Sequence, residues 1–223
     1  RGPCELCFHP MEHESIRLLE ALRLAANEAI IVYRRHADPG AAGGADPGEP
    51  KLLAKVQALG SGAQAAGPED TLVLELRSGE VIIEMRPDLA PNHVARIKEL
   101  TRQGFYDGLV FHRVIDGFMA QTGDPRGDGT GGSGQNIDAE FTQAPFERGT
   151  VGMARSQNPN SGDSQWFIMF ERSSHLDGQY TVWGQVVEGM EHVDRIKKGI
   201  SAMNGVVQDP DKIVSMKVRA DVE

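Results

Sequence analysis

Residues 111–124 read Phe111-His112-Arg113-Val114-Ile115-Asp116-Gly117-Phe118-Met119-Ala120-Gln121-Thr122-Gly123-Asp124. This segment sets one permanent cation, Arg113, and one amide, Gln121, among large apolar side chains. A surface built in this way binds a mostly hydrophobic ligand and polarises one atom of it. The segment therefore indicates a binding groove with a single polarising group.

Two further blocks follow at fixed distances along the chain. The first holds Gly152-Met153-Ala154, Asn158-Pro159-Asn160-Ser161 and Ser164-Gln165-Trp166-Phe167-Ile168. The second holds His175-Leu176-Asp177-Gly178 and Tyr180-Thr181-Val182-Trp183-Gly184-Gln185-Val186. With residues 111–124, they resemble in order and spacing the active-site segments of the cyclophilins, in particular bacterial-like ones, which are peptidyl-prolyl cis/trans isomerases. The resemblance covers roughly residues 70 to 221 and leaves the N-terminal extension unrelated.

The bulk properties allow one ordinary domain and disfavour two classes of partner. A chain of 223 residues with 39% hydrophobic composition can bury a core. Because a phosphate-binding surface needs clustered positive charge, the net charge of −9 gives no support for a nucleic-acid partner. No apolar run approaches the roughly 18 residues of a membrane span, and no signal peptide opens the chain. We expect a cytoplasmic protein, or a periplasmic one if a signal has been removed.

The N-terminal extension, residues 1–36, is predicted to be helical. Residues 12–35 contain neither Pro nor Gly. Apolar residues recur there at helical spacing: Leu18, Leu22, Ala25, Ala29 and Val32. The stripe is wider than a coiled-coil seam, so the helix needs a surface to pack on, either within its own chain or on another subunit.

Residues 37–68 read as a linker rich in Gly, Pro and Ala, in which Ala-Asp-Pro-Gly occurs twice. A short helix over residues 51–59 is one further interpretation. The isomerase-like domain then begins at residue 69 and extends to residue 223.

Within this domain the pattern predicts mainly β structure. Alternating residues on either side of Ser78-Gly79 predict a β-hairpin. Two amphipathic helices are expected, over residues 92–103 and 189–198, stopped by Gly104 and Gly199. The resemblance implies a closed, eight-stranded antiparallel barrel capped by these two helices, with a filled interior and the substrate groove on its outer surface.

Isomerisation of the bond before proline calls for a particular chemistry. The barrier of about 18–20 kcal/mol reflects the loss of amide resonance at the twist. No bond breaks, so catalysis needs neither a nucleophile nor a cofactor. It requires stabilisation of the twisted amide, whose nitrogen accepts a hydrogen bond better than in the planar state. Arg113 suits this task because its guanidinium offers several donors and stays charged.

The resemblance also implies roles for individual residues. Arg113 is the catalytic cation, and Gln121 holds it and reaches the substrate carbonyl. The residues expected to line the proline pocket are Phe118, Met119, Phe167 and Leu176. Ala154 and Arg155 match the segment whose backbone pairs with the peptide, although the family more commonly has Asn in place of Arg155. Gln165 matches a further groove residue.

Two further groove positions depart from the commoner residue of the family. His175 occupies a position where several members have Trp, which contacts cyclosporin, so we expect weak binding of that drug. Tyr180 stands where many members have His and keeps a flat ring with a polar tip. His112 is expected to be structural, facing away from the groove.

Other chemistry-bearing patterns carry less weight. Residues 127–134 are rich in Gly but lack the Lys of a phosphate loop, so we interpret them as a mobile loop bordering the groove. Cys4, Cys7, His9 and His13 lie within ten residues, closer together than zinc fingers normally place their ligand pairs. Zinc binding, a disulfide and free thiols all stay open; we favour free thiols and assign no metal.

Two functions from different classes fit the chain. The first is an isomerase that acts on proline-containing polypeptides and assists protein folding. The alternative is a proline-peptide binding or scaffold module, whose N-terminal helix drives assembly or recruitment. Assays on a proline tetrapeptide, with Arg113→Ala beside the parent chain, separate the two.

The apolar stripe in residues 1–36 predicts self-association, since a lone helix cannot bury it and the linker gives it reach. Sedimentation of the full chain should then give a larger mass than one protomer, whereas a chain starting at Glu69 should sediment as a monomer. Docking of the helix on its own domain is the alternative. Monomer masses for both chains would contradict self-association.

Overall fold

The computed structural model describes residues 66–222. The expected N-terminal helix, most of the linker, its short helix and the Cys and His cluster lie outside the described residues and stay predictions. Within the described range, no helix combines the length and apolarity needed to cross a bilayer.

The first two strands form the predicted hairpin. Strand β1 (Thr71–Leu76) pairs antiparallel with β2 (Gly79–Met85), from Thr71 opposite Glu84 to Leu76 opposite Gly79. Alternate side chains of both strands are buried, as the pattern predicts. Gly79 has a φ of 144° and lies against the ring of His192, which leaves no room for a side chain.

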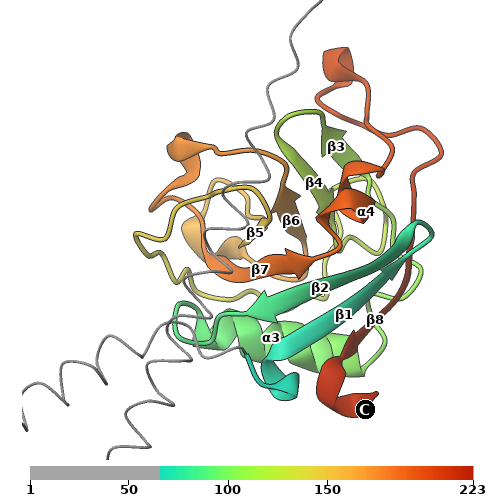
Figure 1. Cartoon of the computed structure of the whole chain (residues 1–223). Coiled ribbons are helices and arrows are strands. Elements are labelled where there is room, and N and C mark those ends of the chain that lie inside the picture. The colour runs from blue at the N-terminus through green and yellow to red at the C-terminus, as the bar shows by residue number, and fades with distance from the viewer. Residues whose placement is uncertain (1–65, 223) are drawn as a thin grey trace, which may run out of the picture. The chain divides into compact units, whose positions relative to one another are not determined.

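Eight strands form one antiparallel, strongly curled sheet (Figure 1). The remaining strands are β3 (Arg113–Ile115), β4 (Met119–Thr122), β5 (Thr150–Met153), β6 (Trp166–Met169), β7 (Val182–Glu188) and β8 (Ile213–Val218). Their order is β3-β4-β6-β5-β7-β2-β1-β8.

Strand pairing does not close the sheet into the expected barrel. The two end strands, β3 and β8, do not pair with each other. Isolated bridges from Val110 to Lys212 and from Arg113 to Val206 connect the two ends instead. The physical reason is that β3 is short and residues 199–207 occupy its free edge. The Val114 amide donates to Gly205 O, and the Gly199 amide donates to Val114 O.

Large aromatic side chains fill the interior of the curled sheet. Trp166 contacts Trp183 edge to face, with ring centroids 5.7 Å apart, and contacts Tyr106 and Phe111 in the same way. All four rings are fully buried. Since protein interiors pack at crystal-like density, a core filled in this way favours a binding site on the outer surface.

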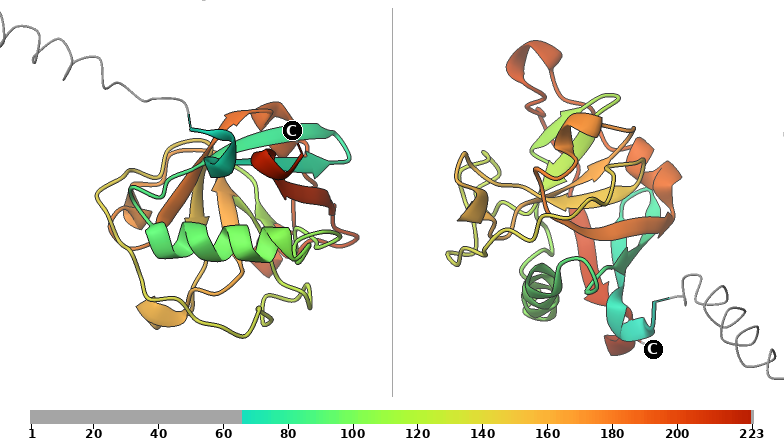
Figure 2. Two further views of the ribbon diagram at one scale, coloured as in Figure 1. Left: turned by 90° about the horizontal axis from the view of Figure 1, so that it is seen from below. Right: turned by 90° about the vertical axis from the view of Figure 1, so that its left-hand side faces the viewer.

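Helix α3 (Pro91–Arg102) confirms the first predicted helix to within one residue at each end. Proline at its first position needs no hydrogen-bond partner there, and Gly104 follows it with a left-handed φ of 70°. Its buried face includes Val94, Ile97 and Leu100. Figure 2 shows α3 lying across one end of the curled sheet.

Helix α4 (Met190–Asp194) is shorter than the predicted 189–198. The backbone tightens after Asp194, and the Asp211 carboxylate accepts the Lys197 amide at 2.8 Å in place of a helical carbonyl. Val193 and Ile196 are nevertheless buried as predicted. The apolar spacing therefore identified the buried face, whereas a partner far away in sequence set the end of the helix.

A buried carboxylate, Asp124, orders the Gly-rich loop after β4. It accepts hydrogen bonds from the backbone amides of Arg126, Asp128 and Gly129 at 2.8, 3.1 and 2.6 Å. Burial pushes the pKa of Asp124 up, but hydrogen bonds from backbone amides of the loop push it down and prevail, so the pKa lies below its ordinary value. The loop that borders the groove is thus held by a charge.

Asp124→Asn should lower the free energy of unfolding by about 1–3 kcal/mol at neutral pH, because a neutral amide accepts the loop amides more weakly. The folded-state pKa lies below the unfolded value of about 3.9, so the stabilisation exists above that value and is lost as the pH falls through the folded-state pKa. Urea unfolding should show a constant difference between parent and variant above about pH 5, which shrinks below about pH 4. Equal stability at neutral pH would contradict this account.

Candidate functional site

A groove of about 440 Å³ on the outer surface gathers almost every predicted site residue. Its lining comprises Arg113, Phe118, Met119, Gln121, Ala154, Arg155, Phe167, His175, Leu176, Gln179 and Tyr180. Gln179 is the addition that the sequence did not indicate. Gln165 lines the adjoining hollow of about 330 Å³. Gly129 and Gly131 also lie there. They belong to the Gly-rich loop of residues 127–134 that Asp124 holds, which we call the tethered loop.

The floor of the groove is apolar. Met119, Phe167 and Leu176 are buried in a cluster separate from the main core. Phe146 supports this floor from beneath, stacked on Phe167 with ring centroids 5.8 Å apart. Gly152 permits this packing, because a side chain there would collide with both rings. The floor is thus a packed apolar surface at the bottom of the groove.

Strand alternation puts this floor outside the sheet. On β4, Ala120 packs into the main core, whereas Met119 belongs to the floor of the groove. Arg113 lies opposite Gln121 across β3 and β4, and Gln121 lies opposite Phe167 across β4 and β6. Cation, amide and apolar floor therefore form one row across three strands.

A chain of amide hydrogen bonds connects Arg113 to the tethered loop. Arg113 Nη1 donates to Gln121 Oε1 at 3.1 Å, and Gln121 Nε2 donates to Gln165 Oε1 at 2.9 Å. Gln165 Nε2 donates in turn to the carbonyl oxygens of Gly131 and Gly129, at 2.8 and 3.1 Å. Each amide is oriented by the next, so the oxygen of Gln121 is aimed at the guanidinium.

Arg113 is a cation held by neutral acceptors. Besides Gln121 it contacts Asn204, whose backbone oxygen accepts from Nε and whose Oδ1 accepts from Nη2, both at 3.0 Å. Among residues 66–222 no carboxylate forms an ion pair with it. Burial lowers the pKa of Arg113, yet a guanidinium stays protonated at neutral pH. Its positive charge therefore remains available to a ligand.

The sequence did not single out Asn204. Its local signal is Asn204-Gly205, a dipeptide typical of turns with left-handed backbone. That signal predicts a turn, but nothing in it predicts contact with a side chain 91 residues earlier in the chain.

Arg155 and Tyr180 form one wall of the groove. The Arg155 guanidinium carbon lies 4.5 Å from the centroid of the Tyr180 ring, a cation–π distance. Arg155 Nε and Nη2 both donate to the Gln179 carbonyl oxygen, at 3.1 and 3.0 Å. The Arg155 side chain thus connects the Tyr180 ring and the Gln179 backbone in one wall.

His112 lies next to Arg113 in sequence but is buried. Burial lowers its pKa, an effect that Asp124 opposes only in part. The imidazole is therefore neutral at physiological pH. This agrees with the structural role expected for it.

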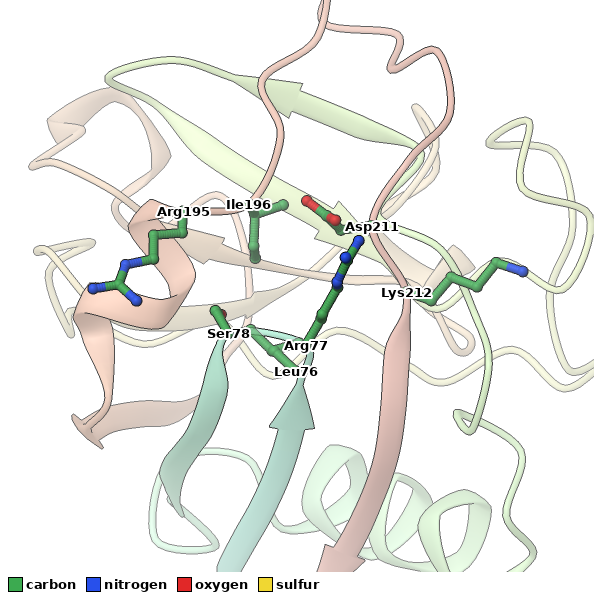
Figure 3. Close-up of a pocket in the computed structure, with 7 residues that line it drawn as sticks. All are labelled: Leu76, Arg77, Ser78, Arg195, Ile196, Asp211 and Lys212. Atoms are coloured by element: carbon green, nitrogen blue, oxygen red, sulfur yellow. The ribbon is translucent and has the colours of Figure 1, made fainter.

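A further cavity of about 280 Å³ lies at the turn of the β1–β2 hairpin (Figure 3). Its lining residues include Arg77, Arg195, Asp211 and Lys212. The side chain of Arg77 points toward Asp211, whereas Arg195 and Lys212 point away on opposite sides (Figure 3). Because the cations do not converge on one point, we assign the function to the groove around Arg113.

Comparison with known families decides the class of the protein. The family described as cyclophilin type peptidyl-prolyl cis-trans isomerase/CLD matches residues 71–218. A probable peptidyl-prolyl cis-trans isomerase of Brucella suis is 57% identical over 173 residues, covering 72% of this chain and 88% of the relative. The chain belongs to the cyclophilin-type peptidyl-prolyl isomerases. The family resemblance and the isomerase activity predicted from the sequence are thereby confirmed.

Relatives with lower sequence identity support the same family assignment. Peptidyl-prolyl cis-trans isomerase B of Bacillus subtilis is 43% identical over 122 residues, which cover 54% of this chain and 85% of the relative. The crystal structure of a cyclophilin from Hirschia baltica superimposes with a TM-score of 0.64 at 29% identity, covering 72% of this chain and 77% of the other. A Cryptosporidium parvum cyclophilin, solved in the presence of the dipeptide Ala-Pro, gives a TM-score of 0.61 at 27% identity and covers 66% and 98%.

His175 sits exposed at the rim of this cyclophilin groove, with its ring 5.7 Å from that of Phe118. His175→Trp should strengthen cyclosporin binding several-fold, because it adds a larger apolar face and an N–H donor. Calorimetric titration of both proteins measures the change. Equal affinities would contradict the role assigned to this position.

Proposed function

We propose that Arg113 is the catalytic residue of this isomerase and that the floor of the groove binds the proline ring. The observation that carries the proposal is a cation whose partners among residues 66–222 are all neutral, placed beside a buried apolar floor. The floor holds the ring still, and the guanidinium donates to the amide nitrogen as the bond twists.

Part of the rate enhancement comes from one hydrogen bond that is stronger in the twisted transition state than in the planar ground state. The planar amide nitrogen is a poor acceptor, so the bond from Arg113 strengthens only at the twisted state, as transition-state stabilisation requires. A charge-assisted bond of about 1.5–3 kcal/mol corresponds to a rate factor of roughly ten to a hundred. Gln121 contributes by fixing the guanidinium and by offering its amide to the substrate carbonyl.

The rest of the groove binds the peptide on either side of proline. Ala154 and Arg155 supply the backbone edge, with Tyr180 packed against Arg155 in the same wall, Gln165 and the tethered loop in the adjoining hollow, and His175 at the exposed rim. The solved Cryptosporidium relative, studied with Ala-Pro, supports a proline peptide as the ligand class. In this proposal the substrates are folding polypeptides with exposed X–Pro bonds, since such bonds isomerise in tens to hundreds of seconds without catalysis.

Arg113→Ala should lower kcat/KM on a proline tetrapeptide by at least about tenfold, the equivalent of about 1.4 kcal/mol. The fold should persist because Arg113 belongs to the surface row and not to the aromatic core. Arg195→Ala, which removes an exposed cation from the cavity at the hairpin turn, is the matched control and should leave kcat/KM unchanged. Full activity of a folded Arg113→Ala protein would refute the assigned mechanism.

A further inference from the structure

Residues 199–207 cover the free edge of β3, the strand that carries Arg113. Hydrogen bonds from the Val114 amide to Gly205 O and from the Gly199 amide to Val114 O tie this segment to the strand. Inside the segment, Ile200 and Val206 bridge each other. Gly199 and Gly205 lie so close together that a side chain at Gly199 would collide with the Gly205 carbonyl oxygen. Gly205 and Val207 are thus buried against the sheet edge, whereas residues 200–204 are exposed.

Asn204 occupies the turn of this loop in a left-handed conformation, with φ 54° and ψ 36°. Asn tolerates this region better than most residues other than Gly. The following residue, Gly205, has a φ of 80°, and a side chain there would meet Val114 and Ile115. The turn therefore points both the backbone oxygen and Oδ1 of Asn204 at the Arg113 guanidinium.

The donors of Arg113 can be counted one by one. A guanidinium carries five N–H groups in a rigid plane. Nε donates to Asn204 O, Nη2 donates to Asn204 Oδ1, and Nη1 donates to Gln121 Oε1. Within the described part of the chain, the second N–H group of Nη1 and that of Nη2 have no acceptor, so both remain for a substrate. Asn204 thus binds the edge of the guanidinium that carries Nε and Nη2. Gln121, on the neighbouring strand, binds Nη1.

We propose that Asn204 is a positioning residue for catalysis, which orients the Arg113 guanidinium so that its two remaining N–H groups face the groove. This proposal rests on the catalytic role proposed for Arg113. Because both oxygens of Asn204 are neutral, the grip leaves the charge of the guanidinium intact. An acidic residue at this place would orient Arg113 equally well but would neutralise it.

Asn204→Gly removes Oδ1 and keeps the left-handed backbone, since Gly adopts this region freely. We expect kcat on a proline tetrapeptide to fall roughly fivefold while KM changes less than about twofold, because proline binding depends on the apolar floor. Asp209→Gly is the matched control. It replaces the other described non-glycine residue with a positive φ, 48°, and should leave kcat unchanged.

Asn204→Asp separates orientation from a purely structural role of the turn. Asp also tolerates the left-handed region, so a merely structural role predicts parental kcat. The proposal predicts a lower kcat instead, because the new carboxylate pairs with the guanidinium and reduces the charge offered to the substrate. This variant also keeps the test decisive if Asn204→Gly destabilises the loop.

A double-mutant cycle distinguishes the failure of this inference from failure of the proposed function. In the Arg113→Ala background, Asn204→Gly should have no further effect on kcat. An equal loss in both backgrounds, or parental kcat for both Asn204 variants while Arg113→Ala is impaired, would overturn the positioning role alone. Full activity of Arg113→Ala would overturn the catalytic role of Arg113, and the positioning role with it.

Discussion

The pairing register of β3, β4 and β6 is the constraint on which the site depends. It places Arg113 opposite Gln121 and Gln121 opposite Phe167, so that a cation, an amide and an apolar ring lie in one row. Side chains alternate between the two faces of a strand, and a slip of one residue would turn the whole row into the core. The aromatic interior resists such a slip, because a charged guanidinium there would be desolvated without a partner.

The filled core also explains why the groove is shallow and external. Trp166 and Trp183 occupy the inside of the curled sheet, and the floor of the groove is a second, smaller cluster on the outside. Both clusters share β6, since Trp166 faces inward and Phe167 outward. The core therefore supports the floor of the groove, although no side chain of the core itself lines the groove.

The polar part of the site follows a consistent electrostatic rule. Carboxylates order the surroundings: Asp124 holds the loop beside the groove, and Asp211 accepts the amide that ends α4. The guanidinium of Arg113 itself meets only amides and carbonyls among the described residues. A carboxylate at this place would accept hydrogen bonds from the guanidinium but would also neutralise its charge. Neutral acceptors orient the guanidinium and leave its positive charge available to a substrate.

Local patterns in the sequence were enough to predict the hairpin of β1 and β2 and helix α3, through alternation around Ser78-Gly79 and an apolar face at helical spacing before Gly104. The residues that line the groove were implied by the resemblance of three segments to the cyclophilins, and not by short-range rules. The end of α4, the open edge between β3 and β8, and the lining by Gln179 could not be predicted in this way. Each depends on contacts between residues distant in sequence, as when Asp211 captures the Lys197 amide.

Arg113 and Asn204 show the same division most clearly. The sequence by itself determined that a cation stands among apolar residues, whereas the left-handed turn at Asn204-Gly205 was not predicted, although this dipeptide is typical of turns. Only the tertiary structure decided that Asn204 accepts hydrogen bonds from Arg113. Residues 199–207 have to fold onto the edge of β3 before these two residues come into contact. The physical reason is that turn preference is a property of neighbouring residues, whereas the partner of a hydrogen bond is chosen by the packing of the whole sheet.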